Sequence, residues 1–369
     1  MRILFMSSAV KVETMYHHRY DVICSAICQD RKHTAQVIHV DPTTGVFDDG
    51  IINAADVIVL HADILSSTYK LIQKWKASGK VVIADLCKPV WFDEMGSMKW
   101  VDGDTGRFTR ELFTQKSIQS NAQLFRWGIR LVDAVISNSN RMIEDWGGKT
   151  PIYYLPDFIP LDEYLIHPPE PHDGVVVGLK LLKNGLQKSV ESGLYDAIEA
   201  IGREKPEARF LFYGDQIELY RNINLNPHQK LYIPIRSIND WQKLLSTIDI
   251  GLIPLLGVED DRTGWFDALE YMVMKIPWVA SENQAFYDIK QYGWLVKNHS
   301  KIWERVLMDM IGNLTAYKED TFGEPYLFAI GMGIDEYIEK LYNIIMSVQD
   351  SQKTREMVIN DSSNHISNK

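Results

Sequence analysis

The chain has 369 residues, of which 46% are hydrophobic and 24% charged, and its formal net charge at pH 7 is −10. This composition excludes a disordered chain, and the length predicts two domains of ordinary size. The acidic balance gives no general attraction to DNA or RNA phosphates, which argues against a nucleic-acid partner.

Cysteine usage and the chain's apolar segments predict a cytoplasmic protein. Cys24 and Cys28 lie one helical turn apart, and Cys87 is the only other cysteine, so no second pair completes a zinc site. We expect buried, reduced thiols. The N-terminal MRILFMSS is too short for a signal peptide, and no segment approaches the roughly 20 apolar residues that span a bilayer. Peripheral contact with a membrane is left open.

Strands and helices alternate through the first half of the chain. The run ADVIVLH (55–61) is almost continuously apolar, which is typical of a strand buried on both faces. The alternation predicts a parallel, doubly wound sheet. We expect strands at 1–7, 35–40, 55–61, 80–85, 134–137 and 152–155, and helices at 16–28, 67–78 and 115–133.

A proline-rich passage, IHPPEPHDG (166–174), predicts the domain boundary because proline interrupts both helices and central strands. The alternation then resumes, with strands at 174–178, 209–214, 248–254 and 278–281. The fold class predicted is α/β, with two Rossmann-like domains whose strands end at a shared cleft. The expected units are a first domain (1–167), a second domain (168–333), a last helix (334–349) and a disordered tail (350–369).

The segment Asp249–Ser281 carries the strongest functional signal. It reads as a buried strand ending at Pro254, a polar loop, a helix and a second buried strand. Glu270 lies inside that helix among apolar residues, where a carboxylate costs free energy unless it accepts hydrogen bonds. A glutamate facing the surface is the alternative interpretation.

This segment resembles the donor-binding region of glycosyltransferases with the GT-B fold, above all the large retaining family 4. DIGLIP (249–254) and LEYMVMKIPWVAS (269–281) match its strand and helix motifs. The resemblance implies that Glu270 accepts both ribose hydroxyls of a nucleotide, as a carboxylate can. It also implies that free backbone N–H groups of Thr263, Gly264 and Trp265 face the donor's phosphates.

Two further segments of the second half resemble the same family. They are GVVVGLKLLKNG (174–185) and FLFYGD (210–215), and the resemblance places Gly178 and Gly214 at the donor site. Lys183, and after it Lys180, are the candidate cations that stabilise a departing diphosphate. A solvated pair of lysines is the alternative.

The first half supplies weaker candidates. ADVIVLH ends at His61, which would hydrogen-bond the donor sugar or the acceptor, or else is a structural histidine. Asp85 occupies the place where many relatives begin an acceptor loop, and Arg19 resembles an arginine that follows the first strand. DAVISNS (133–139) and YYLPDF (153–158) match segments that mostly define the fold.

Several positions depart from the family pattern. Arg262 replaces a glutamate, Asp267 a lysine, Leu179 an arginine and Lys275 a glycine. Arg262 would supply a cation that the missing basic residues otherwise bring. Asp102 and Asp104 imitate the metal-binding carboxylates of another glycosyltransferase fold, but DGDTG is also a ready turn sequence. The aromatic-rich residues 90–100 would shape the acceptor pocket or form an exposed loop.

The resemblance predicts a retaining, metal-independent glycosyltransferase that needs no cofactor. It also implies that 1–167 is the acceptor domain, that 168–333 is the donor domain, and that the last helix (334–349) packs back on the first domain. Its partners would be a nucleotide-diphosphate sugar as donor and a glycan, lipid or small molecule as acceptor. The alternatives are a nucleotide-sugar epimerase of the same fold, a non-catalytic relative that only binds nucleotide sugars, and, as a minor option, sugar transfer to modified DNA bases.

Overall fold

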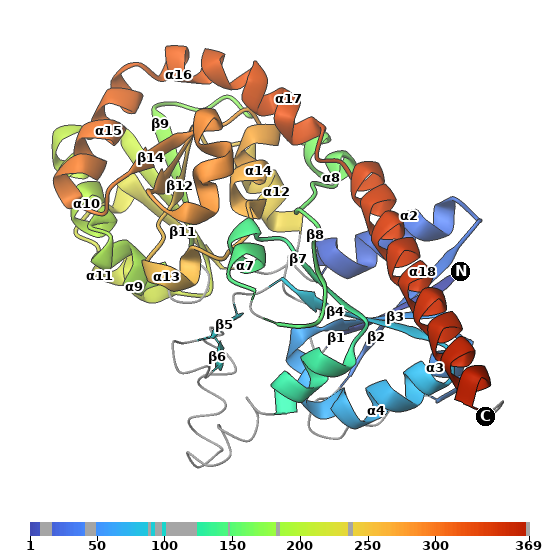
Figure 1. Ribbon diagram of the computed structural model, residues 1–369. Helices are drawn as coiled ribbons and strands as arrows, with labels where there is room; N and C mark the ends of the chain where they lie inside the picture. Colours follow the sequence, from blue (N-terminus) through green and yellow to red (C-terminus); the bar gives the residue numbers. More distant parts are fainter. Residues whose placement is uncertain are drawn as a thin grey trace.

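The computed structural model describes residues 1–7, 17–40, 49–87, 90–92, 98–100, 124–146, 148–181, 185–234 and 239–366. Within these ranges the chain forms two parallel sheets of six strands, each covered by helices on both faces (Figure 1). This is the predicted α/β architecture of two doubly wound domains. Lys183, Asp102 and Asp104 lie outside the described residues.

The first sheet has the strand order β2-β1-β3-β4-β7-β8, and all of its pairings are parallel. In β3 alternate residues enter opposite cores: Ile58 and Leu60 pack on one face of the sheet, Val57 and Val59 on the other. Its strands are β1 (Arg2–Ser7), β2 (Thr34–His39), β3 (Val57–His61), β4 (Val81–Leu86), β7 (Ala134–Ser137) and β8 (Ile152–Tyr154). Its helical elements include the π-helix η1 (His17–Val22), α2 (Ile23–Gln29), α3 (Asp49–Ala54), η2 (Ala62–Ile64), α4 (Leu65–Ala77) and α7 (Asn140–Glu144).

The second sheet has the order β11-β10-β9-β12-β13-β14, the strand order of dinucleotide-binding domains. Its strands are β9 (Val175–Leu181), β10 (Ala208–Gly214), β11 (Lys230–Pro234), β12 (Ile250–Ile253), β13 (Trp278–Ser281) and β14 (Trp294–Val296). Its helices are α9 (Gly185–Glu191), α10 (Leu194–Glu204), α11 (Ile217–Asn222), η3 (Pro227–Gln229), α12 (Asn239–Leu245), α13 (Gly257–Asp260), α14 (Phe266–Val273), η4 (Gln284–Tyr292), α15 (Ser300–Gly312), α16 (Leu314–Thr321) and α17 (Glu324–Ile330).

The chain changes domains earlier than the proline-rich passage. Phe158 packs in the core of the first domain, whereas Ile159 and Tyr164 belong to the core of the second. Helix α8 (Leu161–Leu165) accordingly contacts α12 and α14. The boundary expected after residue 167 is therefore corrected to 158–159, because proline interrupts secondary structure without marking which core a segment joins.

The chain returns to the first domain through α18 (Ile334–Ile366), which runs along the first sheet in Figure 1. Tyr337, Leu341 and Ile345 follow helical spacing and are buried in the first domain's core. The two crossings are joined, since the Ile159 amide donates to the Met332 carbonyl at 2.9 Å. The helix continues to Ile366, so the disorder expected from residue 350 is wrong; no proline or glycine follows Gln349 to interrupt it.

Residues 90–100, expected to be irregular, include a short antiparallel pair, β5 (Val90–Phe92) with β6 (Met98–Trp100). Among the helices in the described ranges, none combines the length and apolar character required to cross a lipid bilayer.

Candidate functional site

The carboxyl ends of β9 and β12 form a switch point in the second sheet. The strand order reverses there, so the connections after these two neighbouring strands leave in opposite directions and open a crevice. A cavity of about 80 Å³ occupies this place. It is lined by Lys180, Gly185, Lys188, Trp241, Leu252, Ile253, Pro254, Leu255, Asp267, Glu270 and Tyr271.

Glu270 enters this cavity from helix α14 and is otherwise enclosed, with 1% of its surface exposed. One carboxylate oxygen accepts from the Tyr164 hydroxyl at 2.8 Å, and the other accepts from Lys180 Nζ at 2.6 Å. Burial raises the pKa of Glu270, and Lys180 opposes that rise. Each oxygen keeps lone-pair capacity for a further donor, so the carboxylate can still bind hydroxyls that reach the cavity.

Lys180, at the end of β9, is shared between two carboxylates. Its Nζ lies 2.6 Å from Glu270 and 3.0 Å from Asp267. Burial acts to lower the pKa of Lys180, but Asp267 and Glu270 outweigh it and the pKa is raised, so the ammonium stays charged. Lys188 is likewise paired with Asp260 at 2.7 Å. An anion entering the cavity therefore meets cations that already have carboxylate partners.

Two of the three backbone N–H groups expected to be free in the loop before α14, those of Thr263 and Trp265, already have acceptors. The Thr263 amide donates to the Asp260 carbonyl at 3.2 Å, and the Trp265 amide donates to the Asp157 carboxylate at 2.9 Å. The guanidinium of Arg262 pairs with Asp145 of the first domain. The chain's own acceptors thus satisfy these groups in this arrangement.

Gly178 and Gly214 have packing reasons for being glycine. A Cβ on Gly178 would lie 2.3 Å from Cδ1 of Ile248, beneath the sheet. Gly214 has φ +152°, and a Cβ there would lie 2.0 Å from the Leu181 carbonyl oxygen. Gly214 therefore allows the ends of β9 and β10 to approach closely at the cavity's edge.

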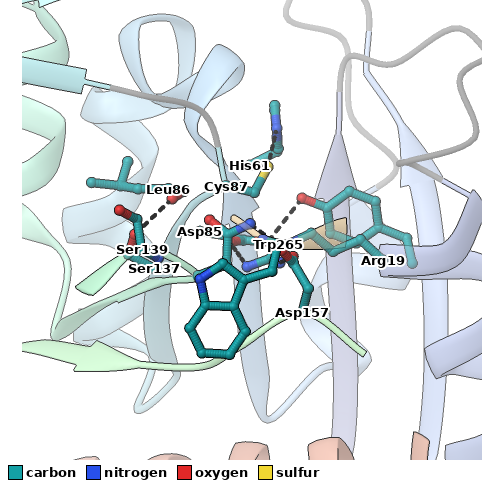
Figure 2. A network of polar contacts seen from close by, with 11 residues as sticks. Arg19, His61, Asp85, Leu86, Cys87, Ser137, Ser139, Asp157 and Trp265 are labelled. Carbon is teal, nitrogen blue, oxygen red and sulfur yellow. Dashed lines mark hydrogen bonds and ion pairs between the residues drawn. The ribbon is translucent and has the colours of Figure 1, made fainter. Parts of the chain in front are cut away.

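A second polar cluster lies at the carboxyl edge of the first sheet. Figure 2 shows Arg19, Asp85 and Asp157 gathered beside Trp265. Arg19 donates to both oxygens of Asp85 at 2.6 Å, and the Tyr20 hydroxyl donates to Asp85 at 3.1 Å. Burial acts to lower the pKa of Arg19, but Asp85 outweighs it and the pKa is raised. Asp85 is 1% exposed, so its carboxylate serves the ion pair with Arg19 in this arrangement.

His61 lies at the same edge but is fully buried. Its Nε2 lies 3.1 Å from the Cys87 Sγ. Its environment fits the structural alternative that the sequence left open. The three candidates of the first domain, His61, Asp85 and Arg19, thus lie at one edge of the sheet but are all buried.

Several contributors to these clusters were not identified as site residues from the sequence, among them Tyr164, Asp157 and Asn138, whose amide donates to Asp157 at 2.7 Å. Tyr164 is 106 positions from Glu270, and its contact depends on how α8 folds onto α14. Asp157 and Asn138 stand in segments that we used only to define the fold. The signal for Asp157 was its charge beside apolar neighbours in YYLPDF (153–158).

Comparison with known proteins identifies relatives by structure alone. No family model matches the sequence, and no curated protein does. Solved structures match across the whole chain. HepE from Anabaena in complex with UDP-glucose has a TM-score of 0.64 at 13% identity, covering 94% of this chain and 100% of that one.

Two other structures match over similar lengths. Sucrose-phosphate synthase from Thermosynechococcus elongatus has a TM-score of 0.63 at 11% identity, over 94% of this chain and 99% of that one. A putative UDP-N-acetylglucosamine 2-epimerase from Listeria monocytogenes has a TM-score of 0.58 at 11% identity, over 95% and 97%. At these identities the likeness shows the fold alone, and it confirms the predicted GT-B class.

Proposed function

We propose that this chain, which has the GT-B fold, is a glycosyltransferase that moves a sugar from a nucleotide-sugar donor to a glycan, lipid or small-molecule acceptor. The observation that carries the proposal is Glu270. It is a buried carboxylate at the strand-end switch point of the second sheet, and it lines a cavity beside Lys180. Among the structures of like fold, HepE is in complex with UDP-glucose, and another is named a sucrose-phosphate synthase.

In this proposal Glu270 accepts the ribose hydroxyls of the nucleotide. A cavity of about 80 Å³ holds a fragment of a donor, since small-molecule pockets measure roughly 300–1,000 Å³. The phosphates and the sugar would then lie toward the first domain. Lys180, with Lys183 from outside the described residues, would stabilise the charge on the leaving diphosphate.

The reaction we propose retains the configuration of the transferred sugar and needs no divalent cation or other cofactor. Positioning of the two substrates and electrostatic stabilisation of the leaving group would supply the catalysis. Nuclear magnetic resonance of the first-formed product reports its anomeric configuration. Transfer that persists in excess chelator supports the metal-independent mechanism, and transfer that requires an added cation contradicts it.

The test begins by measuring, for each of a panel of nucleotide sugars, the shift in the protein's melting temperature and the rate at which the sugar is hydrolysed. The donor that both stabilises the protein and is consumed identifies the substrate. Glu270→Ala should then weaken donor binding about tenfold or more, because two hydrogen bonds to a charged group are lost. Glu282→Ala, at an exposed position of the same domain, is the control. A folded Glu270→Ala protein that binds donor as the parent does would remove the ribose assignment.

A nucleotide-sugar epimerase is the second candidate, favoured by the likeness to the Listeria structure over 95% of this chain. An epimerase converts its nucleotide sugar with no acceptor present, whereas a transferase shows only slow hydrolysis under those conditions. A protein that binds nucleoside diphosphate but consumes no donor would instead be a non-catalytic binding relative.

A further inference from the structure

Asp157 lies where the chain passes from one domain to the other. It stands next to Phe158, the last residue packed in the first core before the chain enters the second domain, and two residues before the crossing hydrogen bond between Ile159 and Met332. Only 9% of Asp157 is exposed, and burial raises its pKa, with Arg19 opposing the rise. A carboxylate at a crossing point is costly unless its partners hold it in place.

The partners of Asp157 come from both domains. One oxygen accepts from Asn138 Nδ2 at 2.7 Å and lies 3.6 Å from Nη1 of Arg19, both in the first domain. The other oxygen accepts from the Trp265 amide at 2.9 Å, in the second domain. Trp265 is the N-cap residue of α14, and the Trp265 side chain makes no capping hydrogen bond to that helix. The first domain therefore supplies the acceptor for the start of the helix that carries Glu270.

Gly264 makes this approach sterically feasible. A Cβ at this position would lie 1.9 Å from Asp157 Oδ2 and 2.3 Å from Asn138 Nδ2. Both distances are far below any real contact, so the domains can meet this closely only with glycine here. The contact thus depends on Asp157 of the first domain and on Gly264 of the second domain.

We propose that Asp157 is a positioning residue that sets the spacing of the two domains, by holding the start of α14, and with it Glu270, against the Arg19–Asp85 pair. The proposal rests on the proposed function only for the claim that donor and acceptor meet between the two domains. A misplacement of about 1 Å between reacting groups can lower turnover on the order of a hundredfold, so such a contact matters for transfer.

The experiment alters the contact from each side in the full chain. Asp157→Ala removes the acceptor, and Gly264→Ala inserts a methyl group without changing any charge. Asp162→Ala, an exposed aspartate five residues farther along, is the matched control. The first readout is the exchange rate of the Trp265 amide hydrogen, which should rise about tenfold or more in both variants and stay within about twofold in the control. Small-angle scattering should show a larger radius of gyration for both variants.

The second readout is kinetic. Both variants should lose about tenfold or more in kcat for transfer to acceptor, while the KM for donor stays within about threefold of the parent. Parental exchange rates, or an unchanged kcat in variants with faster exchange, would overturn the positioning role. If the parent consumes no donor at all, the proposed function fails. The amide exchange rate of Trp265 and the radius of gyration then test by themselves whether Asp157 sets the spacing of the domains.

Discussion

Lys180 is the residue whose partners determine how strongly the second domain attracts an anion. Glu270 and Asp267 both contact its ammonium group, and Asp267 is the more exposed, with 44% of its side chain accessible. The family pattern that the sequence resembles often has a lysine at the position of Asp267. This chain therefore places negative charge where a donor's phosphates would approach.

Asp267→Asn should tighten the binding of a nucleoside diphosphate about threefold to tenfold. The substitution removes a like charge near the phosphates and leaves Lys180 with one carboxylate partner. Titration calorimetry at low salt measures the effect, and salt should reduce it. Asp196→Asn, at an exposed position on α10, should bind as the parent does. Weaker binding to Asp267→Asn would mean that Asp267 itself contacts the donor.

Among single residues, the sequence drew attention to Glu270, because a carboxylate in an apolar helix requires hydrogen-bond partners. It did not identify those partners. Lys275 is a further case: its φ of +59° lies in the left-handed region, which fits the glycine of the family pattern that the sequence resembles. Its ammonium lies 4.4 Å from the ring centroid of Tyr326, a contact that sequence spacing does not reveal.

Strands were the elements most readily predicted. β3, β4 and β12 are fully buried, and the sequence shows this as short, continuous apolar runs. The resemblance assigned Gly178 and Gly214, which lie inside or at the end of strands, to the donor site. The structure gives them a steric reason that depends on the neighbouring strand or helix, which a one-dimensional pattern does not contain.

Gly214→Ala should destabilise the second domain by about 3 kcal/mol or more. The backbone angle is strained for alanine, and the added methyl group would collide with the Leu181 carbonyl, which belongs to a central strand. Gly312→Ala, at the end of α15 with no atom within 4 Å of the new Cβ, should be stabilising by up to about 1 kcal/mol. Urea unfolding followed by circular dichroism compares the two, and equal midpoints would contradict the steric argument.

The whole molecule depends on helix α18 to complete the first domain. Its residue Leu341 is fully buried in the core formed with α2 and the first sheet. The apolar stripe of this helix could be read from the sequence, but the position of the domain boundary could not. Pro168, Pro169 and Pro171 are exposed and lie within the second domain's surface, whereas the crossing occurs between the apolar residues Phe158 and Ile159.

Leu341→Ala should lower the free energy of unfolding of the first domain by about 2–5 kcal/mol, since it leaves a cavity in a close-packed core. The matched control is Met346→Ala on the same helix, a residue that is 49% exposed. Differential scanning calorimetry should show the Leu341→Ala transition at lower temperature and the control close to the parent. Equal shifts for both variants would mean that α18 is not packed on the first sheet as described.

Because the chain crosses between the domains twice, at Ile159 and at Met332, the two domains can complete their folding in a different order from their synthesis. The second domain is an insertion within the first, and all of it has been synthesised before α18 begins. On the ribosome, that later-encoded half can fold first, while the earlier-encoded strands wait for the helix that covers them. The first-translated part of this protein is therefore the last to be finished.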